Sequence, residues 1–355
     1  MNENWSYLGE FSAWTSYFSP YKLWALYIDD IIIFAVFFFF SSVNGNNDND
    51  SKKFPEIKGI DPKLLKVIDG VTYFAFSAAD RISLRSILDN VRNFQVRDDD
   101  VFVAGFPRSG NHWAFEVVNM ILRGKLEFAE VSFHTRILEL MDSCPNERLK
   151  EVESPRQITS HSKLSVLPKQ IVEKKAKVIF LIRNPKDAML SMFRLYSVFK
   201  NERFRYTGTW EEFLELQFQE RFMHGGWFDQ VLDVERFMKN HPDVPVYVHS
   251  FEKMKENPVE ATRALCKFLG RPEDLVEDIA NVTQFRNMKE KLDAGKLGKV
   301  KDQVFQQGSE GILQKGATGG WKNAFTVAQS EAFDRVFQEK MAGSELAKLV
   351  LPYMK

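Results

Sequence analysis

The sequence predicts an α/β fold, a parallel sheet flanked by helices, from two observations. Three short apolar runs, Val101–Gly105, Lys177–Ile182 and Val244–Val248, are each followed by an amphipathic stretch. Runs of this length that end at turn residues are typical of buried strands. Strands that alternate with helices favour parallel pairing, with helices on both faces of the sheet.

The predicted helices have recognisable starts and ends. A helix over about residues 112–123 carries its apolar residues on one face. After the second predicted strand, Asn184 is placed as an N-cap and Pro185 occupies the first helical position. A further helix is expected over Pro258–Leu269, where Gly270 would end it.

The N-terminal extension, residues 1–54, differs from the rest of the chain. An apolar block at 23–40 precedes a polar linker at 41–53 that is rich in Asn, Asp and Ser. A membrane span needs about 20 apolar residues, and each central Asp costs about 3 kcal/mol on insertion scales. Because Asp29 and Asp30 interrupt the block, a cytoplasmic protein is favoured, with membrane contact by residues 23–40 as the alternative.

Composition excludes several classes of partner. Forty-eight basic and 48 acidic residues cancel, so no global positive field would draw the protein to nucleic acid. Cys144 and Cys266 are the two cysteines of the chain. They are too few for a disulfide framework and lack the spacing of a zinc site, so a reducing compartment and no metal are expected.

The loop after the first predicted strand has the features of an anion site. Gly105 and Gly110 have the spacing of a Walker A loop, and backbone N–H groups at a helix start favour anions. Asn111 and His112 stand where that motif has its lysine and its magnesium-binding hydroxyl, which disfavours metal-dependent hydrolysis of ATP or GTP. Arg108 could pair bidentately with a phosphate or sulfate. The ordinary alternative is a tight turn with a surface arginine.

Three further features suit the same chemistry, although each has an ordinary explanation as a surface or loop residue. Arg183 follows the second strand, at the edge where open α/β sheets bind ligands, and Ser191 lies two turns into the next helix. The glycine-containing run Lys315–Asn323 would give a ligand access to the backbone. His161 follows the short run Gln157–Ser160 and could take a hydroxyl proton near neutral pH.

Taken in order, these segments resemble the cytosolic sulfotransferase family, which transfers a sulfuryl group from 3′-phosphoadenosine 5′-phosphosulfate (PAPS) to small alcohols, phenols or amines. The resemblance covers roughly residues 55–355 and implies a single, P-loop-like sulfotransferase domain. PAPS would be the co-substrate without a metal, and the acceptor would be a small molecule that the sequence does not identify. The supporting segments are Asn93–Asp100, Arg183–Asp187, Gly226–Asp229, Met254–Pro258 and Lys315–Thr326.

The resemblance also implies a role for each matching residue. His161 would be the catalytic base, and Arg108 would stabilise the leaving phosphate. The 3′-phosphate would be bound by Arg183 and Ser191, with Gln314, Lys315 and Gly316 closing over it. Residues around the 5′-phosphosulfate and the adenine would be Arg108, Ser109, Gly110, Asn111, His112, Trp113, Phe251, Thr283 and Phe285.

Several positions depart from the family pattern. Arg108 stands where the family usually has lysine, and Asn111 and His112 replace a threonine pair. Gln314 replaces an arginine that helps to bind the 3′-phosphate, and Gly320 replaces an aspartate. Losing one charge-assisted bond costs about 1.5–3 kcal/mol, or about ten- to a hundredfold in affinity. One alternative is therefore a weakened or inactive nucleotide-binding relative. Another is a membrane-anchored carbohydrate sulfotransferase, which Arg108 and the apolar block at 23–40 resemble.

A short C-terminal pattern predicts a homodimer. Lys322, Thr326, Val327 and Glu331 reproduce the dimerisation pattern of the family. Two such segments that cross about a two-fold axis would pair each Lys322 with the partner's Glu331. The alternative is a solvated loop and helix start.

Overall fold

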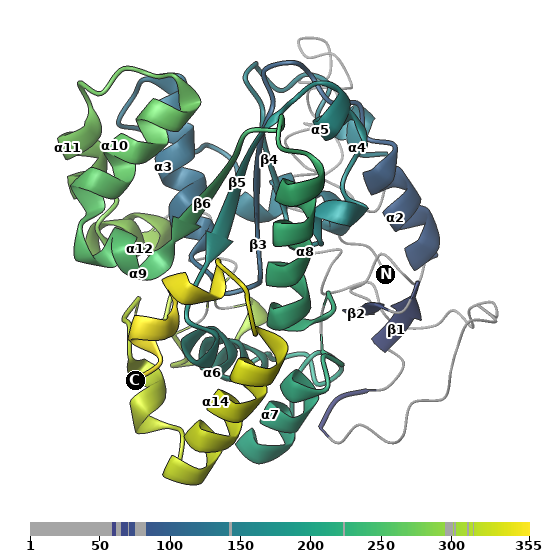
Figure 1. Cartoon of the computed structure of the whole chain (residues 1–355). Helices are drawn as coiled ribbons and strands as arrows, with labels where there is room; N and C mark the ends of the chain where they lie inside the picture. Colours follow the sequence, from purple (N-terminus) through teal and green to yellow (C-terminus); the bar gives the residue numbers. More distant parts are fainter. Residues whose placement is uncertain are drawn as a thin grey trace, which may run out of the picture. The chain divides into compact units, whose positions relative to one another are not determined.

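A parallel sheet lies at the centre of the fold (Figure 1). Within the described residues its strands are β3 (Val101–Gly105), β4 (Gln157–Ser160), β5 (Lys177–Ile182) and β6 (Val246–Ser250), in the order β4-β3-β5-β6. Every residue of β3 is buried, as expected of a sheet that has helices on both faces. The first two predicted strands are confirmed with their bounds, and the third begins at Val246 rather than Val244.

The computed structural model describes residues 59–355 apart from gaps at 62–64, 70, 75–82, 142–143, 223, 295–300, 302, 311 and 315. The described residues belong to one compact unit. The extension at 1–54, its apolar block at 23–40, its linker at 41–53 and Lys315 lie outside these residues, so what was predicted for them stays a prediction. Among the described residues, no helix is long and apolar enough to span a membrane.

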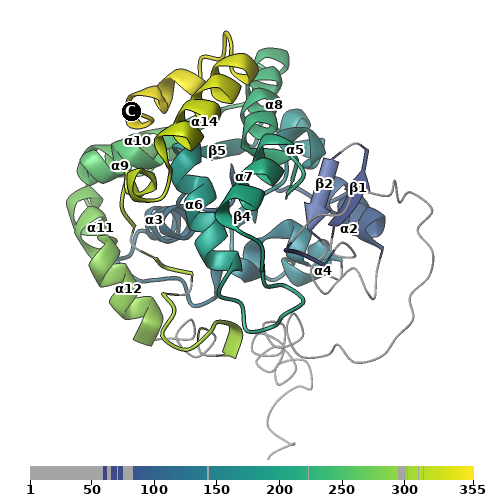
Figure 2. The same cartoon turned by 90° about the horizontal axis from the view of Figure 1, so that it is seen from below.

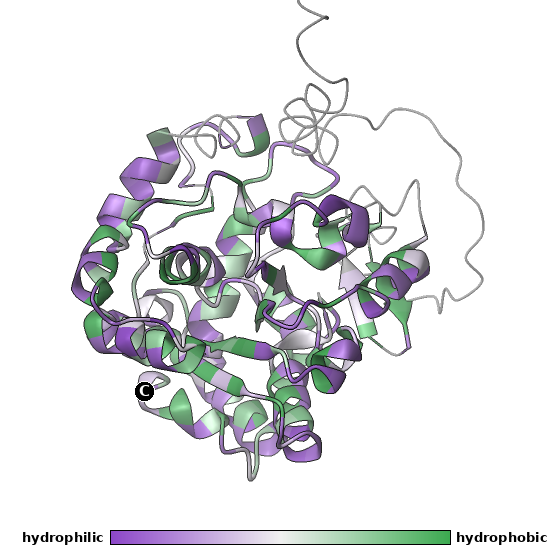
Figure 3. Cartoon of the chain, turned by 90° about the horizontal axis from the view of Figure 1, so that it is seen from above, coloured by the Kyte–Doolittle hydropathy of each residue, from purple (hydrophilic) through white to green (hydrophobic). Residues whose placement is uncertain are grey.

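Helices cover both faces of the sheet. On one face, α3 (Asn111–Arg123) packs against α10 (Pro258–Leu269) and α11 (Val276–Val282), while α8 (Gly226–Asn240) lies on the other face (Figures 1 and 2). Hydrophobic residues gather along the strands, and hydrophilic residues are spread over the surrounding helices (Figure 3). Within the described residues, the other α-helices and the antiparallel hairpin are α2 (Leu84–Arg92), α4 (Pro145–Arg148), α5 (Gln170–Glu173), α6 (Pro185–Tyr196), α7 (Trp210–Phe218), α9 (Phe251–Glu256), α12 (Phe285–Ala294), α14 (Val327–Lys340), β1 (Leu65–Ile68) and β2 (Val71–Phe74).

The predicted helix ends are confirmed. Asn184 caps α6 by accepting a hydrogen bond from the backbone N–H of Lys186 at 3.0 Å, and Pro185 is the first helical residue. Helix α10 ends at Gly270, whose φ of 69° lies in the left-handed region that glycine adopts at little cost. These local signals place α6, and with it Ser191, directly after the carboxyl end of β5.

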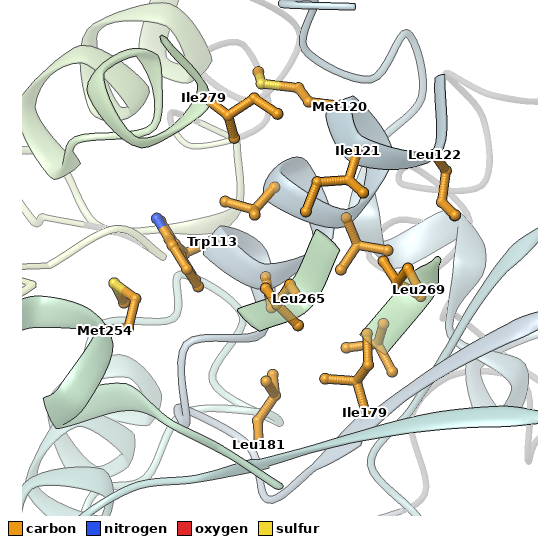
Figure 4. Packing of buried hydrophobic residues seen from close by; sticks show 14 of the residues in the cluster. Trp113, Met120, Ile121, Leu122, Ile179, Leu181, Met254, Leu265, Leu269 and Ile279 are labelled. Atoms are coloured by element: carbon orange, nitrogen blue, oxygen red, sulfur yellow. The ribbon is translucent and has the colours of Figure 1, made fainter. Parts of the chain in front are cut away.

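The main hydrophobic cluster fixes α3 against the sheet. It joins Val103 of β3 and Leu181 of β5 to apolar residues of α3, α10 and α11. Trp113, from the start of α3, lies at the end of the cluster away from Leu122 (Figure 4). The start of α3 is therefore held by packing close to the carboxyl end of β3.

The start of α6 also anchors the C-terminal part of the chain. The Asp187 carboxylate accepts hydrogen bonds from the backbone N–H groups of Gly319 at 2.7 Å and Trp321 at 2.9 Å. The fully buried ammonium of Lys186 pairs with Asp334 at 2.7 Å and lies 4.2 Å from the centre of the Trp321 ring. These contacts hold the segment after Ile312 over the carboxyl edge of the sheet.

A buried ion pair joins the segment before β3 to the start of β4. Arg156 donates from Nε to Asp100 Oδ1 at 2.8 Å and from Nη2 to Oδ2 at 2.6 Å, and both side chains are buried. The two parallel bonds orient both groups and satisfy charges that would otherwise be costly inside the protein.

Replacing Asp100 by Asn should lower the free energy of unfolding by about 3–5 kcal/mol, because the Arg156 charge stays buried without its partner. Urea denaturation measures the change. Asp98→Asn is the matched control, since its partner Lys174, 3.0 Å away, lies at the surface, and it should cost at most about 1 kcal/mol. Equal losses in the two variants would contradict this account of the buried pair.

Candidate active site

The carboxyl ends of the strands bring several predicted site residues to one edge of the sheet. The loop with Arg108 follows β3, His161 follows β4, Arg183 follows β5, and Phe251 follows β6. Because all four strands are parallel, these ends meet at the same edge, where ligands bind in open α/β sheets. The structure thus confirms that the predicted residues gather, although it does not by itself assign their roles.

The loop between β3 and α3 is shaped by two left-handed residues. Arg108 has a φ of 73° and Gly110 a φ of 96°, and α3 begins at Asn111. A Cβ atom on residue 110 would lie 2.7 Å from the Phe251 ring, so glycine is required there. The Ser109 hydroxyl is buried and has no hydrogen-bond partner among the described residues. The loop therefore leads into a helix start with a free hydroxyl donor.

Two guanidinium groups lie together beside this loop. Arg183 donates from Nη1 to the Arg108 carbonyl at 2.7 Å and from Nη2 to the Ala317 carbonyl at 3.1 Å. Arg108 donates from Nε to Ser191 Oγ at 3.0 Å and from Nη2 to the Ile312 carbonyl at 2.7 Å. Desolvation and the charge of Arg183 lower the pKa of Arg108 to about 10. Both groups remain cations at neutral pH.

No carboxylate of the described residues pairs with either arginine within 4.0 Å. Asp187 and Glu252 are near enough to oppose the desolvation that lowers the pKa of Arg183. Their oxygens, however, accept hydrogen bonds from backbone N–H groups, including that of Asn184 at 2.8 Å. Cations in a desolvated site that have no carboxylate in direct contact favour a bound anion.

His161 is held in the tautomer that can accept a proton. Its Nδ1 lies 2.9 Å from the carbonyl oxygen of Gly105. A carbonyl only accepts, so Nδ1 carries the hydrogen and Nε2 the lone pair. Desolvation lowers the pKa of His161 to about 4, an effect that the bond to Gly105 opposes and the charge of Arg108 increases. The ring is neutral at pH 7, with Nε2 available as an acceptor.

Glu139 is a site residue that sequence reasoning missed. Its carboxylate accepts hydrogen bonds from the backbone N–H of His161 and, at 3.0 Å, from Ser160 Oγ. Desolvation raises the pKa of Glu139 to about 7, while these hydrogen bonds oppose the shift. Glu139 lies in a short 3-10 helix, Leu138–Leu140, within a stretch that has no helical or strand periodicity, so no sequence signal identified it.

Several histidines gather around one aromatic ring beside His161. The ring of Phe133 lies 4.4 Å from that of His112, 5.6 Å from that of His134 and 6.0 Å from that of His161. The His224 ring is 6.3 Å from His161. Desolvation lowers the pKa of all four histidines. This side of His161 is consequently polar and aromatic but carries no imidazolium charge at pH 7.

Three of the predicted adenine-contacting residues belong to the cluster that fixes α3, or pack against it. Trp113 and Phe251 are members, and Phe285 packs against the cluster. The Arg183 guanidinium lies 4.3 Å from the centre of the Phe251 ring. Thr283 is buried, and its hydroxyl donates to the Ile279 carbonyl at 2.7 Å. Trp113, Phe251 and Phe285 are thus gathered in or against one cluster.

The C-terminal segment also reaches the site. Gln314 donates to the Ser191 carbonyl at 3.2 Å and accepts from the Ser191 hydroxyl at 3.1 Å. Gly316 lies against Phe285, whose ring would be 2.3 Å from a Cβ atom at residue 316. Lys315, between them, lies outside the described residues. Among those residues, no group of His, Cys, Asp and Glu is arranged to hold a metal ion.

Comparisons with known proteins identify the family. The sequence model of the sulfotransferase domain matches residues 98–345. The chain belongs to the sulfotransferase family. It is 35% identical over 267 residues to mouse sulfotransferase 1A1, covering 73% of this chain and 90% of that protein. It is 34% identical over 278 residues to human sulfotransferase 2A1, covering 76% and 92%.

A solved structure agrees with this sulfotransferase assignment. Mouse sulfotransferase SULT7A1, in complex with PAP, is 30% identical and superposes with a TM-score of 0.65, covering 82% of this chain and 99% of that one. The comparisons confirm the predicted fold and the predicted enzyme class, a PAPS-dependent sulfotransferase. The roles of individual site residues, the homodimer and the cytoplasmic location stay predictions.

One buried histidine of this sulfotransferase should make stability depend on pH. Desolvation lowers the pKa of His249 from 6.5 to about 4, and its ring stacks on that of Trp113 at 5.4 Å. As pH falls through 6.5, the unfolded chain takes up a proton there that the folded protein does not, so stability present at pH 7 is lost towards pH 4.

His249→Gln should therefore reduce the loss of unfolding free energy between pH 7 and pH 5.5 by about 1 kcal/mol. Urea denaturation of the variant and the unsubstituted protein at both pH values measures this difference. An unchanged pH dependence in the variant would show that His249 is protonated in the folded state.

Proposed function

We propose that this protein transfers a sulfuryl group from PAPS to a hydroxyl or amine group of a small molecule, with His161 as the base. The proposal rests on one observation: a neutral histidine and two cations lie at the same edge of the sheet. His161 presents an unprotonated Nε2 there, while Arg108 and Arg183 lack a paired carboxylate among the described residues. The PAP bound to the related mouse SULT7A1 supports this choice of nucleotide.

The residues of this chain fit a phosphorylated nucleotide. Ser109 Oγ and Arg183 Nε are buried polar atoms that have no partner among the described residues, as expected where a ligand supplies one. Glycine at 110 and 316 lets the backbone lie against Phe251 and Phe285, where a side chain would clash. Backbone N–H groups at the start of α3 add a favourable field for a phosphate.

In this arrangement His161 Nε2 accepts the proton of the acceptor O–H or N–H. As it does so, the bond from the acceptor atom to sulfur forms and the bond from sulfur to the 5′-phosphate oxygen breaks. Negative charge develops on the departing phosphate, and donors already in place stabilise it without reorganisation. The hydrogen bond from Nδ1 to Gly105 then stabilises the imidazolium, because a charged ring donates more strongly.

His161→Ala should lower the transfer rate by about 10²–10⁴-fold, since that is the usual contribution of a positioned base. The measurement is transfer of radiolabelled sulfate from PAPS to a panel of phenols, alcohols and amines. Binding of PAP, followed by calorimetry, should persist, because the loop and both arginines are intact. Normal turnover in the variant would remove His161 from the reaction.

Thermal stabilisation separates the alternatives for the whole protein. A sulfotransferase is stabilised by PAP more than by ATP with magnesium, and it turns over at least one acceptor. Stabilisation by PAP without turnover of any acceptor would instead favour the inactive nucleotide-binding relative. Stabilisation by ATP with magnesium alone would overturn the nucleotide assignment.

We infer in addition that the protein forms a homodimer through Lys322, Thr326, Val327 and Glu331. Thr326 caps α14, and the next residue, Val327, exposes 76% of its surface, which suits a partner's apolar contact. Lys322 and Glu331 are exposed on either side. A second copy related by a two-fold axis would cover Val327 and pair the flanking charges.

Lys322→Glu should shift the protein towards the monomer in sedimentation velocity, because it places like charges opposite each other. Combining Lys322→Glu with Glu331→Lys restores opposite charges and should restore the dimer. A monomeric unsubstituted protein, or a double variant that stays as weak as the single one, would contradict the predicted pairing.

A further inference from the structure

A second imidazole lies beside the proposed base. The ring of His224 lies 6.3 Å from that of His161, at an interplanar angle of 49°. His224 is buried, and its Nδ1 atom has no hydrogen-bond partner among the described residues. The Nδ1 atom of His161, in contrast, lies 2.9 Å from the Gly105 carbonyl. No step of the proposed transfer uses the free nitrogen of His224.

The turn before α8 brings the His224 ring to this position. His224 has a φ of 51°, and Gly225 and Gly226 follow with φ of 83° and 84°. All three residues lie in the left-handed region, which residues other than glycine adopt at a cost. A Cβ atom at residue 225 would lie 2.7 Å from an oxygen of the Asp229 carboxylate, so the turn is packed tightly. Backbone strain of this kind is typical of residues that bind ligands.

Contacts to both residues fix the separation of the two imidazole rings. Gln230 of α8 donates from Nε2 to the His161 carbonyl. This bond ties His161 to a helix that begins two residues after His224. The buried ring of Tyr73 packs edge-on against the His224 ring, with 5.7 Å between the ring centres and an angle of 88°. The distance between the two imidazoles is therefore set by packed elements of the fold.

We propose that His224 binds a second hydroxyl of the acceptor, next to the hydroxyl that His161 deprotonates. This inference rests on the proposed function and names the class of acceptor, a molecule with hydroxyl groups on neighbouring carbon atoms. In the transfer, the first hydroxyl loses its proton to His161 Nε2, and its oxygen gains the sulfuryl group. The second hydroxyl keeps its proton and forms a hydrogen bond with His224 Nδ1.

The charge state of His224 suits a hydroxyl. Desolvation and, to a smaller extent, the nearby His161 lower the pKa of His224 to about 3, so its ring is neutral at pH 7. A neutral imidazole donates from one nitrogen and accepts at the other. A hydroxyl can bond to Nδ1 in either tautomer, because it both donates and accepts. A charged second group, in contrast, would gain no ion pair from this ring.

The separation of the rings suits hydroxyls on neighbouring carbons. The 6.3 Å between the centres of the His161 and His224 rings is of the order of two hydrogen bonds of about 2.8 Å each. Two oxygens on adjacent carbon atoms can therefore bond to one ring each. An acceptor with a single hydroxyl leaves the buried Nδ1 of His224 unpaired, which is costly. His224 should consequently set a preference for diols.

Matched acceptors test this second contact. Transfer of radiolabelled sulfate from PAPS is measured with catechol and phenol, and with 1,2-cyclohexanediol and cyclohexanol. The unsubstituted protein should prefer the diol of at least one pair by about five- to a hundredfold in kcat/KM, the usual effect of one buried polar group left unpaired. Hydroquinone should resemble phenol, because its second hydroxyl lies at the opposite end of the ring from the first.

Substitutions of His224 separate hydrogen bonding from packing. His224→Phe keeps an aromatic ring and removes both nitrogens, so it should abolish the preference for the diol and leave kcat/KM for the partner with one hydroxyl nearly unchanged. His224→Gly should give the same result, and it suits the left-handed backbone if phenylalanine does not fold there. His224→Asn also tolerates this backbone and keeps a hydrogen-bonding group, so it should retain part of the preference.

His241→Phe is the matched control, because His241 follows the other end of α8 and packs against Phe237 at 4.9 Å. It should change no preference. Equal kcat/KM within both pairs for the unsubstituted protein would overturn the inference, as would turnover of other acceptors but of neither pair. An equal loss for both members of a pair in the His224 variants would also overturn it, since it would indicate a structural role of the ring. Absence of turnover with every acceptor tested would instead refute the proposed function, and the inference with it.

Discussion

The structure depends on holding two like charges side by side at the carboxyl edge of the sheet. Arg108 and Arg183 repel each other, and the partial loss of hydration adds to the cost of keeping them there. Backbone carbonyls hold them in place: Arg183 bonds to Arg108 and Ala317, and Arg108 bonds to Ile312. Carbonyl partners orient the cations without neutralising them, so positive charge remains for a ligand.

The surrounding elements serve this arrangement. The indole of Trp227 on α8 donates to the Arg183 carbonyl at 3.0 Å and fixes the end of β5. Asp187 holds Gly319 and Trp321, and its charge also favours the charged form of Arg183. The Asp187 carboxylate therefore both positions the C-terminal segment and favours the positive charge of Arg183. A displacement of Gly319 or Trp321 would therefore also change the surroundings of the carboxylate that lies near Arg183.

The sequence predicted those parts of the fold and site that depend on local signals. Buried strands, the Asn184 cap and the Gly270 end follow from residue types within a few positions of each other. The gathering of His161 and Arg183 follows as well, because parallel strands end at a common edge. The direction of Arg108 could not be predicted, since it depends on a left-handed backbone and on contacts to Ser191 and Ile312, which are distant in the chain. Glu139 was missed because its stretch has no periodicity and its contacts, to Ser160 and His161, form only in the folded chain.

The same charges bear on the basicity of His161, the proposed base. Arg108 is one of the causes that lower the pKa of His161 to about 4, after desolvation. An anion that pairs with Arg108 cancels part of that charge, so the smaller, electrostatic part of the lowering of the His161 pKa is reduced while desolvation remains. A base of higher pKa takes a hydroxyl proton more readily, provided that it stays neutral at the working pH. Occupation of an anion site at Arg108 would therefore strengthen His161 in its proposed role as the base.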